Sequence, residues 1–179
     1  MKSDPRTDWS VIGERDQQSV TADWMPVDGC PIDGVCVKEV RAITIGSGVL
    51  TEIYRSDWKL DDLPVSQIFQ RTIAEGSISA WHAHSLATDR LFCSVGRVKV
   101  GLYDGRRHSP SHGKGWIRIF GEHRPMLITI PPGVWHGVRC LGGSNALVIN
   151  AVDIAFEYEN PDHWRLPSDT DQIPVDLSA

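Results

Sequence analysis

The sequence lacks any long uninterrupted hydrophobic run. No apolar stretch approaches the roughly 20 residues that a helix needs to cross a bilayer. The N-terminus carries Asp4, Arg6 and Asp8 and has no apolar core of the kind found in secretory signals. These absences predict a soluble, cytoplasmic protein that has no membrane partner.

Dense positive charge is also lacking. The net charge is -5, and the acids and bases are scattered along the chain. The one dense basic cluster is formed by Arg106, Arg107 and His108. This pattern disfavours nucleic acid as a partner.

Cysteine is scarce, and its four copies do not have CxxC spacing. A chain without a secretory signal has no need of a disulfide framework, so we expect none.

Long helical periods are missing as well, and short apolar runs separated by Gly, Pro, Asp and Ser take their place. A length of 179 residues favours one domain. We expect an N-terminal extension over residues 1–34 and a single domain over residues 35–179 whose C-terminal tail, from about residue 158, wraps the body. In the extension, Trp9 and Trp24 are large apolar groups that we expect to pack on the body or on a partner subunit.

The apolar runs alternate with polar residues as in many short antiparallel strands. Residues 91–102 alternate on both sides of Gly96, which predicts a β-hairpin or one long kinked strand. An all-β sandwich or barrel follows. The other expected strands cover residues 50–54, 66–73, 78–84, 116–120, 126–130, 137–141 and 146–156.

Two histidines provide the first chemical signal. His82 and His84 are two residues apart on an expected strand, so both side chains project from one face. The surrounding pattern has Gly76 six residues before His82, Asp89 five residues after His84, and Gly96 seven residues later. This spacing resembles the first motif of the cupin superfamily, G(X)5HXH(X)3-4E(X)6G, with Asp89 in the place of the usual Glu.

A second cupin motif contains PxGxxH. Pro131, Gly133 and His136 match it, whereas Pro125 and Cys140 stand where cupins have Gly and Asn. The resemblance implies a jelly-roll barrel, the double-stranded β-helix, in which His82, His84, Asp89 and His136 converge on one metal ion. Imidazoles with a carboxylate suit Fe, Mn, Zn, Ni or Cu, and the spacing does not select among these divalent metals.

A broader resemblance, over residues 35–177, is to the dTDP-4-dehydrorhamnose 3,5-epimerase family, a branch of the cupins that works without a metal cofactor. Four segments carry the likeness. They are Gly48-x-Leu50-x-Glu52-x-Tyr54-Arg55, the segment from Gly76 to His82, Ile130-Pro-Pro-Gly-Val-Trp-His-Gly137, and Tyr158 with Pro161, Trp164 and Arg165. The family resemblance also implies a homodimer with exchanged N-terminal strands.

In that family, a histidine base and a tyrosine acid move protons at the carbons next to a 4-keto group. His82 matches the base, and an imidazole suits the task because its ordinary pKa lies near 6.5. Several partners do not match: Ser79 stands at an arginine, Ile149 near the tyrosine acid, and Asp89 near a lysine. The resemblance therefore implies an epimerase or isomerase of divergent activity.

The substrate-binding candidates are then His136, Glu52 and Tyr158, with Arg71 and Arg90 as positive partners for an enolate. Tyr103 and Tyr158 are candidates for a substitute acid.

Three hypotheses remain. The first is an epimerase-like cupin acting on a nucleotide-linked keto sugar, with His82 as its base and no cofactor. The second is a metal-dependent isomerase, lyase or oxygenase that uses His82, His84, Asp89 and His136. The third is a non-catalytic cupin that binds sugar.

Overall fold

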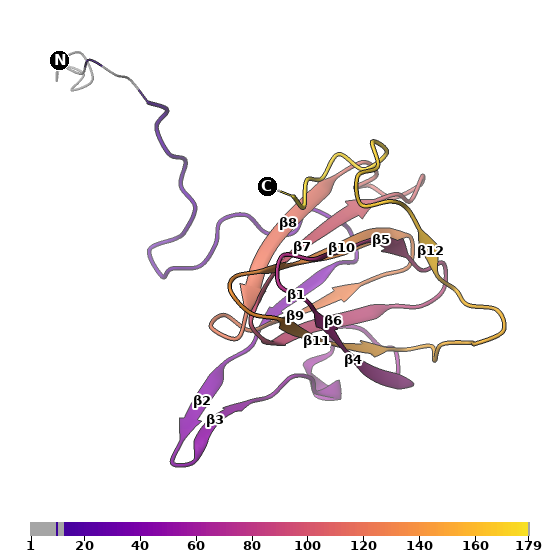
Figure 1. Ribbon diagram of the computed structural model, residues 1–179, viewed down its shortest axis with the longest axis horizontal. Coiled ribbons are helices and arrows are strands. Elements are labelled where there is room, and N and C mark those ends of the chain that lie inside the picture. Colours follow the sequence, from indigo (N-terminus) through magenta and orange to yellow (C-terminus); the bar gives the residue numbers. More distant parts are fainter. Residues whose placement is uncertain (1–9, 11–12, 179) are drawn as a thin grey trace.

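The computed structural model describes Ser10 and residues 13–178. Trp9 and most of residues 1–12 of the expected extension therefore lie outside the described residues. The first described residues of the extension lead away from the body without regular structure (Figure 1), whereas its end packs on the body, where Ile32 is buried in the main core and Asp28 pairs with Arg118. Trp24 is 80% exposed, so the expected packing of this residue on its own body is not found.

Two five-stranded antiparallel sheets form the body of the protein (Figure 1). The first has the strand order β1-β9-β6-β11-β4, and the second has the order β12-β5-β10-β7-β8. The strands of the first sheet are β1 (Cys36–Glu39), β4 (Gln67–Ile73), β6 (Asp89–Val95), β9 (Met126–Ile130) and β11 (Ala146–Val152). Those of the second are β5 (Ile78–Ala83), β7 (Arg97–Asp104), β8 (Gly115–Gly121), β10 (Val134–Leu141) and β12 (Trp164–Arg165).

A separate hairpin of β2 (Ala42–Ile45) and β3 (Gly48–Thr51) projects from the body, and one 3-10 turn spans Ser56–Trp58. Within the described residues, no helix has the length and apolar composition that crossing a membrane requires. The predicted all-β architecture is confirmed.

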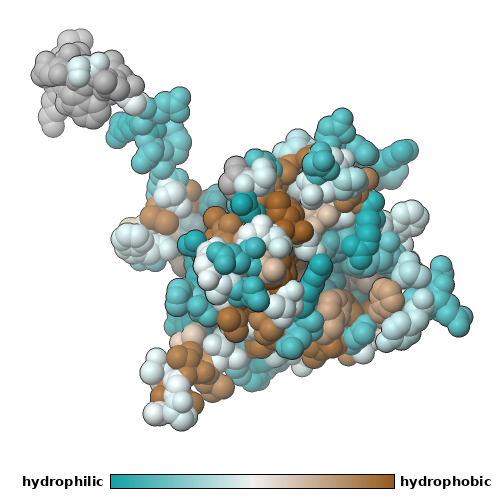
Figure 2. Space-filling model, in the orientation of Figure 1, coloured by the Kyte–Doolittle hydropathy of each residue, from teal (hydrophilic) through white to brown (hydrophobic). Residues whose placement is uncertain are grey.

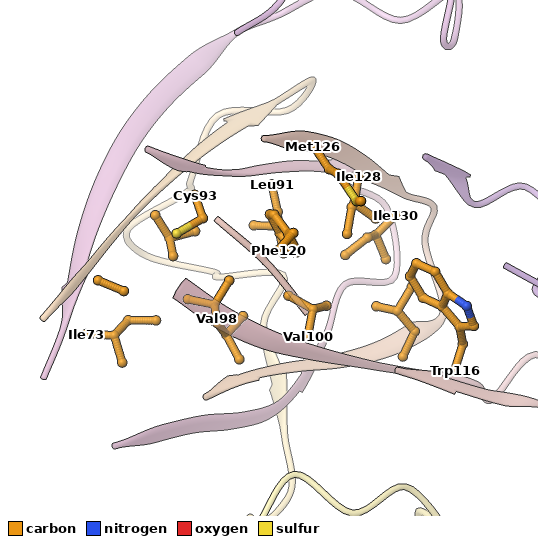
Figure 3. Packing of buried hydrophobic residues seen from close by; sticks show 14 of the residues in the cluster. Ile73, Leu91, Cys93, Val98, Val100, Trp116, Phe120, Met126, Ile128 and Ile130 are labelled. Atoms are coloured by element: carbon orange, nitrogen blue, oxygen red, sulfur yellow. The ribbon is translucent and has the colours of Figure 1, made fainter. Parts of the chain in front are cut away.

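The main core fills the space between the two sheets, as Figure 3 shows. Alternate side chains of β6 and β7 point into it, which places Leu91 and Cys93 against Val98 and Val100. Trp116 and Phe120 of β8 and Ile128 and Ile130 of β9 close the cluster from both sides. Burial of these apolar side chains is the main stabilising contribution to the sandwich.

The pairing of strands β6 and β7 excludes the β-hairpin that was one of two alternatives for residues 91–102. The two strands do not pair with each other, because β6 pairs with β9 and β11 while β7 pairs with β8 and β10. The segment is the kinked long strand rather than the hairpin. Gly96 turns the chain from one sheet into the other at φ +77°, a conformation that favours glycine.

The outer faces of the sheets are covered by segments without regular structure. Trp81 points outward from β5 and packs with Ile173 and Leu177 of the C-terminal tail. On the other sheet, Phe92 packs under Tyr54 and Trp58. The tail therefore wraps the body as predicted, and its apolar residues explain why it stays attached.

Two expected strands have other bounds in the structure. The strand expected over residues 50–54 is Gly48–Thr51, and the one expected over residues 146–156 ends at Val152. Residues 153–156 leave the sheet, and the carboxylate of Asp153 accepts a hydrogen bond from the backbone N–H of Thr88 in the loop before β6.

Gly137 lies in close contact with the C-terminal tail on the outer face of the second sheet, so a substitution there tests the packing of the tail. An added Cβ would lie 2.5 Å from Cβ of Ala80 and 2.7 Å from Cδ1 of Leu177. We expect Gly137→Ala to lower the free energy of unfolding by about 1–3 kcal/mol in urea titrations, as overpacking does. Gly143→Ala is the matched control, because no atom lies within 4 Å of its added Cβ. Equal stability of the two variants would contradict the packing described here.

Candidate functional site

A cavity of about 150 Å³ lies between the two sheets, where β5 and β10 face β6 and β11. One wall carries imidazoles and carboxylates, and the opposite wall, from β4, β11 and the segment after β11, is mainly apolar. The polar lining residues are Gln67, Arg71, Ser79, His82, His84, Asp89, Asn150, Asp162 and His163. The cavity thus combines an apolar interior with a few convergent polar groups, as small-molecule sites do.

His82 lies at the centre of this polar wall because its strand has neighbours on both sides. It pairs directly with His136 of β10 and with Arg165 of β12. Residues directly opposite on antiparallel strands bring their side chains together, and the ring centroids of His82 and His136 are 4.1 Å apart.

The pairing of β5 with β10 is irregular just beyond this point. His136 pairs with His82, but Val138 pairs with Ser79, so β5 contains one extra residue. An extra residue reverses the side-chain alternation along a strand. Ser79 therefore lines the same cavity as His82, whereas regular alternation would turn it away.

The carboxylate of Asp89 connects the histidines. Its Oδ2 atom lies 2.9 Å from Nε2 of His136 and 3.2 Å from Nε2 of His84. Its Oδ1 atom accepts a hydrogen bond of 2.5 Å from the amide of Asn150. Burial raises the pKa of Asp89, but the hydrogen bonds from His136 and His84 outweigh this effect and hold the pKa well below its ordinary value. Asp89 is therefore a buried, ionised carboxylate.

His84 is one of the two imidazoles that present Nε2 to this carboxylate. Its Nδ1 lies 2.5 Å from the backbone carbonyl oxygen of Asp162, and its Nε2 faces Asp89. Both neighbours only accept hydrogen bonds, so both ring nitrogens carry protons. Burial lowers the pKa of His84, yet the hydrogen bond and the charge of Asp89 give a net increase.

His82 has the opposite character. Burial lowers its pKa strongly, and the neighbouring His136 lowers it further. Its imidazole is therefore neutral in the folded protein, with a lone pair available on one ring nitrogen. This is the protonation state that a general base needs.

His163 and Asn150 belong to the cavity wall, although no motif in the sequence pointed to them. The ring of His163 is 5.2 Å from that of His82 and 5.0 Å from that of His84, measured between centroids. The sequence could have indicated Asn150, because an amide side chain inside an apolar strand needs a buried hydrogen-bond partner. His163 carried no such signal, since the resemblance of its segment rests on Tyr158, Pro161, Trp164 and Arg165 and not on this position.

Arg71 and Arg90, the two arginines expected to bind an enolate, lie on different sides of the first sheet. Arg71 of β4 lines the cavity and donates a hydrogen bond to the hydroxyl of Ser79. Arg90 lies on the opposite face of β6, where it donates to both carboxylate oxygens of Asp61, at 2.8 and 2.5 Å. Its guanidinium holds the segment around Leu63 on the outer face of the sheet and does not line the cavity.

Three further candidates also lie away from the cavity of this chain. Glu52 is exposed beside the β2–β3 hairpin and forms an ion pair with Arg55. Tyr158 is 84% exposed, and Tyr103 packs on the outer face of the second sheet. Among the described residues, no tyrosine lines the cavity.

The four expected metal ligands lie in one region, but only three of them have ligand atoms close enough to share a metal ion. Ligand atoms of His84, Asp89 and His136 lie within 4.8 Å of one another, and His82 is outside this group. A metal needs a ring nitrogen with a free lone pair. His84 has none while Asp162 and Asp89 accept its two N–H groups, so the present arrangement is that of a hydrogen-bonded ion pair.

Known proteins share this arrangement of strands. No protein-family model matches the chain. A probable low-salt glycan biosynthesis epimerase, Agl13 of Haloferax volcanii, is 36% identical over 149 residues, which cover 83% of this chain and 96% of the relative.

Solved structures agree with this match. A dTDP sugar isomerase from Desulfovibrio desulfuricans has a TM-score of 0.76 at 32% identity, covering 83% of this chain and 96% of that protein. A dTDP-4-dehydrorhamnose 3,5-epimerase from Elizabethkingia anophelis, at 18% identity, has the same fold with a TM-score of 0.72 and covers 85% of both chains.

The neutral state of His82 and His163 predicts how stability depends on pH. In the unfolded chain both histidines titrate near pH 6.5, whereas burial, aided by Arg165, lowers the pKa of His163 to about 4. Between these values the unfolded chain binds more protons than the folded one, so the free energy of unfolding decreases as the pH falls from about 6.5 to about 4. His84 adds nothing in this window, because it is charged in both states.

We expect His163→Gln to make this decrease shallower in urea titrations at pH about 6.5 and about 4.5, because one proton is removed from the difference. An unchanged slope would show that His163 is not held neutral by the fold.

Proposed function

Because the chain belongs to the dTDP-4-dehydrorhamnose 3,5-epimerase-like family of cupins, we propose that it removes a proton from a carbon next to the keto group of a nucleotide-linked sugar. The observation that carries this proposal is the position of the His82 imidazole on the wall of the cavity, beside the rings of His136 and His163. We also propose a cytoplasmic location.

His82 is the proposed base. A ring nitrogen takes the proton from the carbon, and the electron pair of the broken C–H bond moves into the enolate. The ion pair of His84 and Asp89 and the amide of Asn150 hold the wall around the base in place, and so limit reorganisation during the reaction. His136 packs against the ring of His82 and limits its orientations.

The opposite wall suits the rest of the substrate. Phe69 and Phe156 offer apolar surface, and Arg71 carries a positive charge at the same wall. We propose that Arg71 meets the phosphates of the nucleotide, for which a guanidinium is well suited. No tyrosine of the described residues lines the cavity, which supports a divergent activity in which the second proton transfer differs from that of the family.

A metal-dependent enzyme is the second candidate, favoured by the close approach of His84, Asp89 and His136. The third candidate is a protein that binds a nucleotide sugar without converting it. The three candidates differ in proton exchange, in the effect of a chelator and in nucleotide binding.

The direct test is incubation with a dTDP-4-keto-6-deoxy sugar in deuterated water, followed by NMR. We expect deuterium at the carbons next to the keto group, and an exchange rate at least about 100-fold lower in His82→Gln, because a general base contributes about that much or more. His123→Gln is the control, since its side chain is 96% exposed.

The same samples separate the alternatives. Exchange that persists after treatment with a chelator supports the proposed base, whereas exchange that is lost and then restored by a divalent metal supports the metal enzyme. If the wild-type protein binds dTDP but catalyses no exchange, the result supports the third candidate, a protein that binds a nucleotide sugar without converting it.

We further propose that the protein is a homodimer formed through the β2–β3 hairpin. Ile43, Ile45 and Leu50 lie on this hairpin, are 46–59% exposed, and share one face, because Ile43 pairs with Leu50. Figure 2 shows the projecting hairpin as a hydrophobic feature on this side of the molecule. Apolar surface of this kind is typical of an interface.

Light scattering after gel filtration is expected to give twice the chain mass of 19.9 kDa. Ile43→Ser combined with Leu50→Ser is expected to shift the protein to the monomer mass, because the apolar face is lost. Thr44→Ser changes the other face of the hairpin and serves as the control. A double variant that keeps the dimer mass would place the interface elsewhere.

A further inference from the structure

His163 has an unusual buried atom. Its Nε2 is enclosed and has no hydrogen-bond partner among the described residues, although the residue lines the cavity. Leaving such a polar group unpaired costs about 1–3 kcal/mol. Unsatisfied buried groups are rare in native proteins, and one that lines a ligand cavity suggests that the ligand is the missing partner.

The segment that carries His163 is firmly attached. The carboxylate of Asp162 accepts hydrogen bonds from the backbone N–H groups of Ser85, Leu86 and Ala87 and from the hydroxyl of Ser85, at 2.5–3.2 Å. On the other side of His163, Trp164 pairs with Ala83. The imidazole is therefore positioned by its two neighbours in sequence, while its Nε2 makes no hydrogen bond within the described residues.

The proposed reaction needs a hydrogen-bond donor at the keto oxygen, where the negative charge of the enolate develops. Arg90 is bound to Asp61 on the other face of its sheet. Both N–H groups of His84 already have acceptors. Of the imidazoles that line the cavity, His163 has a buried ring nitrogen without a hydrogen-bond partner in the described part of the chain.

The charge state of His163 fits this task. Its pKa is lowered to about 4, first by burial and then by Arg165 and His84. At neutral pH the ring is uncharged and carries one N–H group. A neutral imidazole can polarise a carbonyl group and stabilise the enolate through a hydrogen bond without giving up its proton.

We propose that His163 is a catalytic residue that donates a hydrogen bond from Nε2 to the keto oxygen of the sugar. This inference rests on the proposed function of the cavity, and it adds the donor that the family resemblance left unassigned. His82 takes the proton from the carbon, so one C–H bond breaks and one N–H bond forms. The electron pair passes to the oxygen, and the hydrogen bond from His163 shortens as the charge on that oxygen grows.

The separation of the two rings agrees with these roles. Their centroids are 5.2 Å apart, too close for a sugar ring to fit between them. Both imidazoles therefore meet the substrate from the same side, at neighbouring atoms. A reacting carbon and the oxygen of the adjacent keto group are such neighbours.

Two substitutions separate hydrogen bonding from shape. His163→Phe keeps a planar ring and removes the donor, and we expect it to lower kcat for deuterium exchange by about 100-fold to 1000-fold. His163→Gln keeps an amide donor that reaches about as far as Nε2, and we expect it to retain kcat within about tenfold. The dissociation constant for dTDP is expected to stay within about twofold in both, because dTDP lacks the keto sugar.

Each outcome bears on the inference. Exchange by His163→Phe at the wild-type rate would overturn it and leave the proposed function intact. Equal losses in both variants, together with weaker dTDP binding, would show a purely structural role and would also overturn it. A wild-type protein without exchange would overturn the proposed function and this inference together, whereas a slow Phe variant with a rescued Gln variant would support both.

Discussion

The buried carboxylate of Asp89 is the group on which the rest of the site depends. It belongs to β6 of the first sheet, and it meets His136 of the second sheet and His84 just beyond β5. An ionised group in this position would be strongly destabilising without partners, because burial removes its hydration. Its contacts therefore link the two sheets at the end of the sandwich where the cavity lies.

The pairing with Asp89 also divides the histidines by charge. His84 lies between the carboxylate and the carbonyl oxygen of Asp162 and is the cation. His82 and His163 receive no such partner, and burial lowers the pKa of each. A cluster of similar side chains thus contains one fixed ion pair and two neutral rings that face the cavity, which suits the proposed removal of a proton next to a carbonyl group.

The alternation of the strands was readable from the sequence, and so was much of the neighbourhood of the histidines. Residues that are two positions apart on a strand project from the same face, so the sequence placed His82 and His84 at the same cavity. Ser79 was not readable in this way, because the extra residue in β5 reverses its direction. Arg90 was misjudged for a related reason: its strand is covered on both faces, so a buried arginine there has a structural partner, Asp61, on the outer side. Which face of a doubly covered strand meets a ligand depends on segments distant in sequence.

By itself, the sequence determined the all-β class, the position of Gly96 where the chain turns, and the resemblance that named His82 as a base. Those features depend on local spacing and on turn chemistry, which short segments express directly. Only the tertiary structure decided that Asp89 binds two histidines, that His84 carries the charge, and that His163 joins the cavity. These depend on burial and on contacts between different segments of the chain, such as Asp89 with His136 and His84 with Asp162. A protonation state is set by the partners and the solvent that a folded group meets, and no local pattern records them.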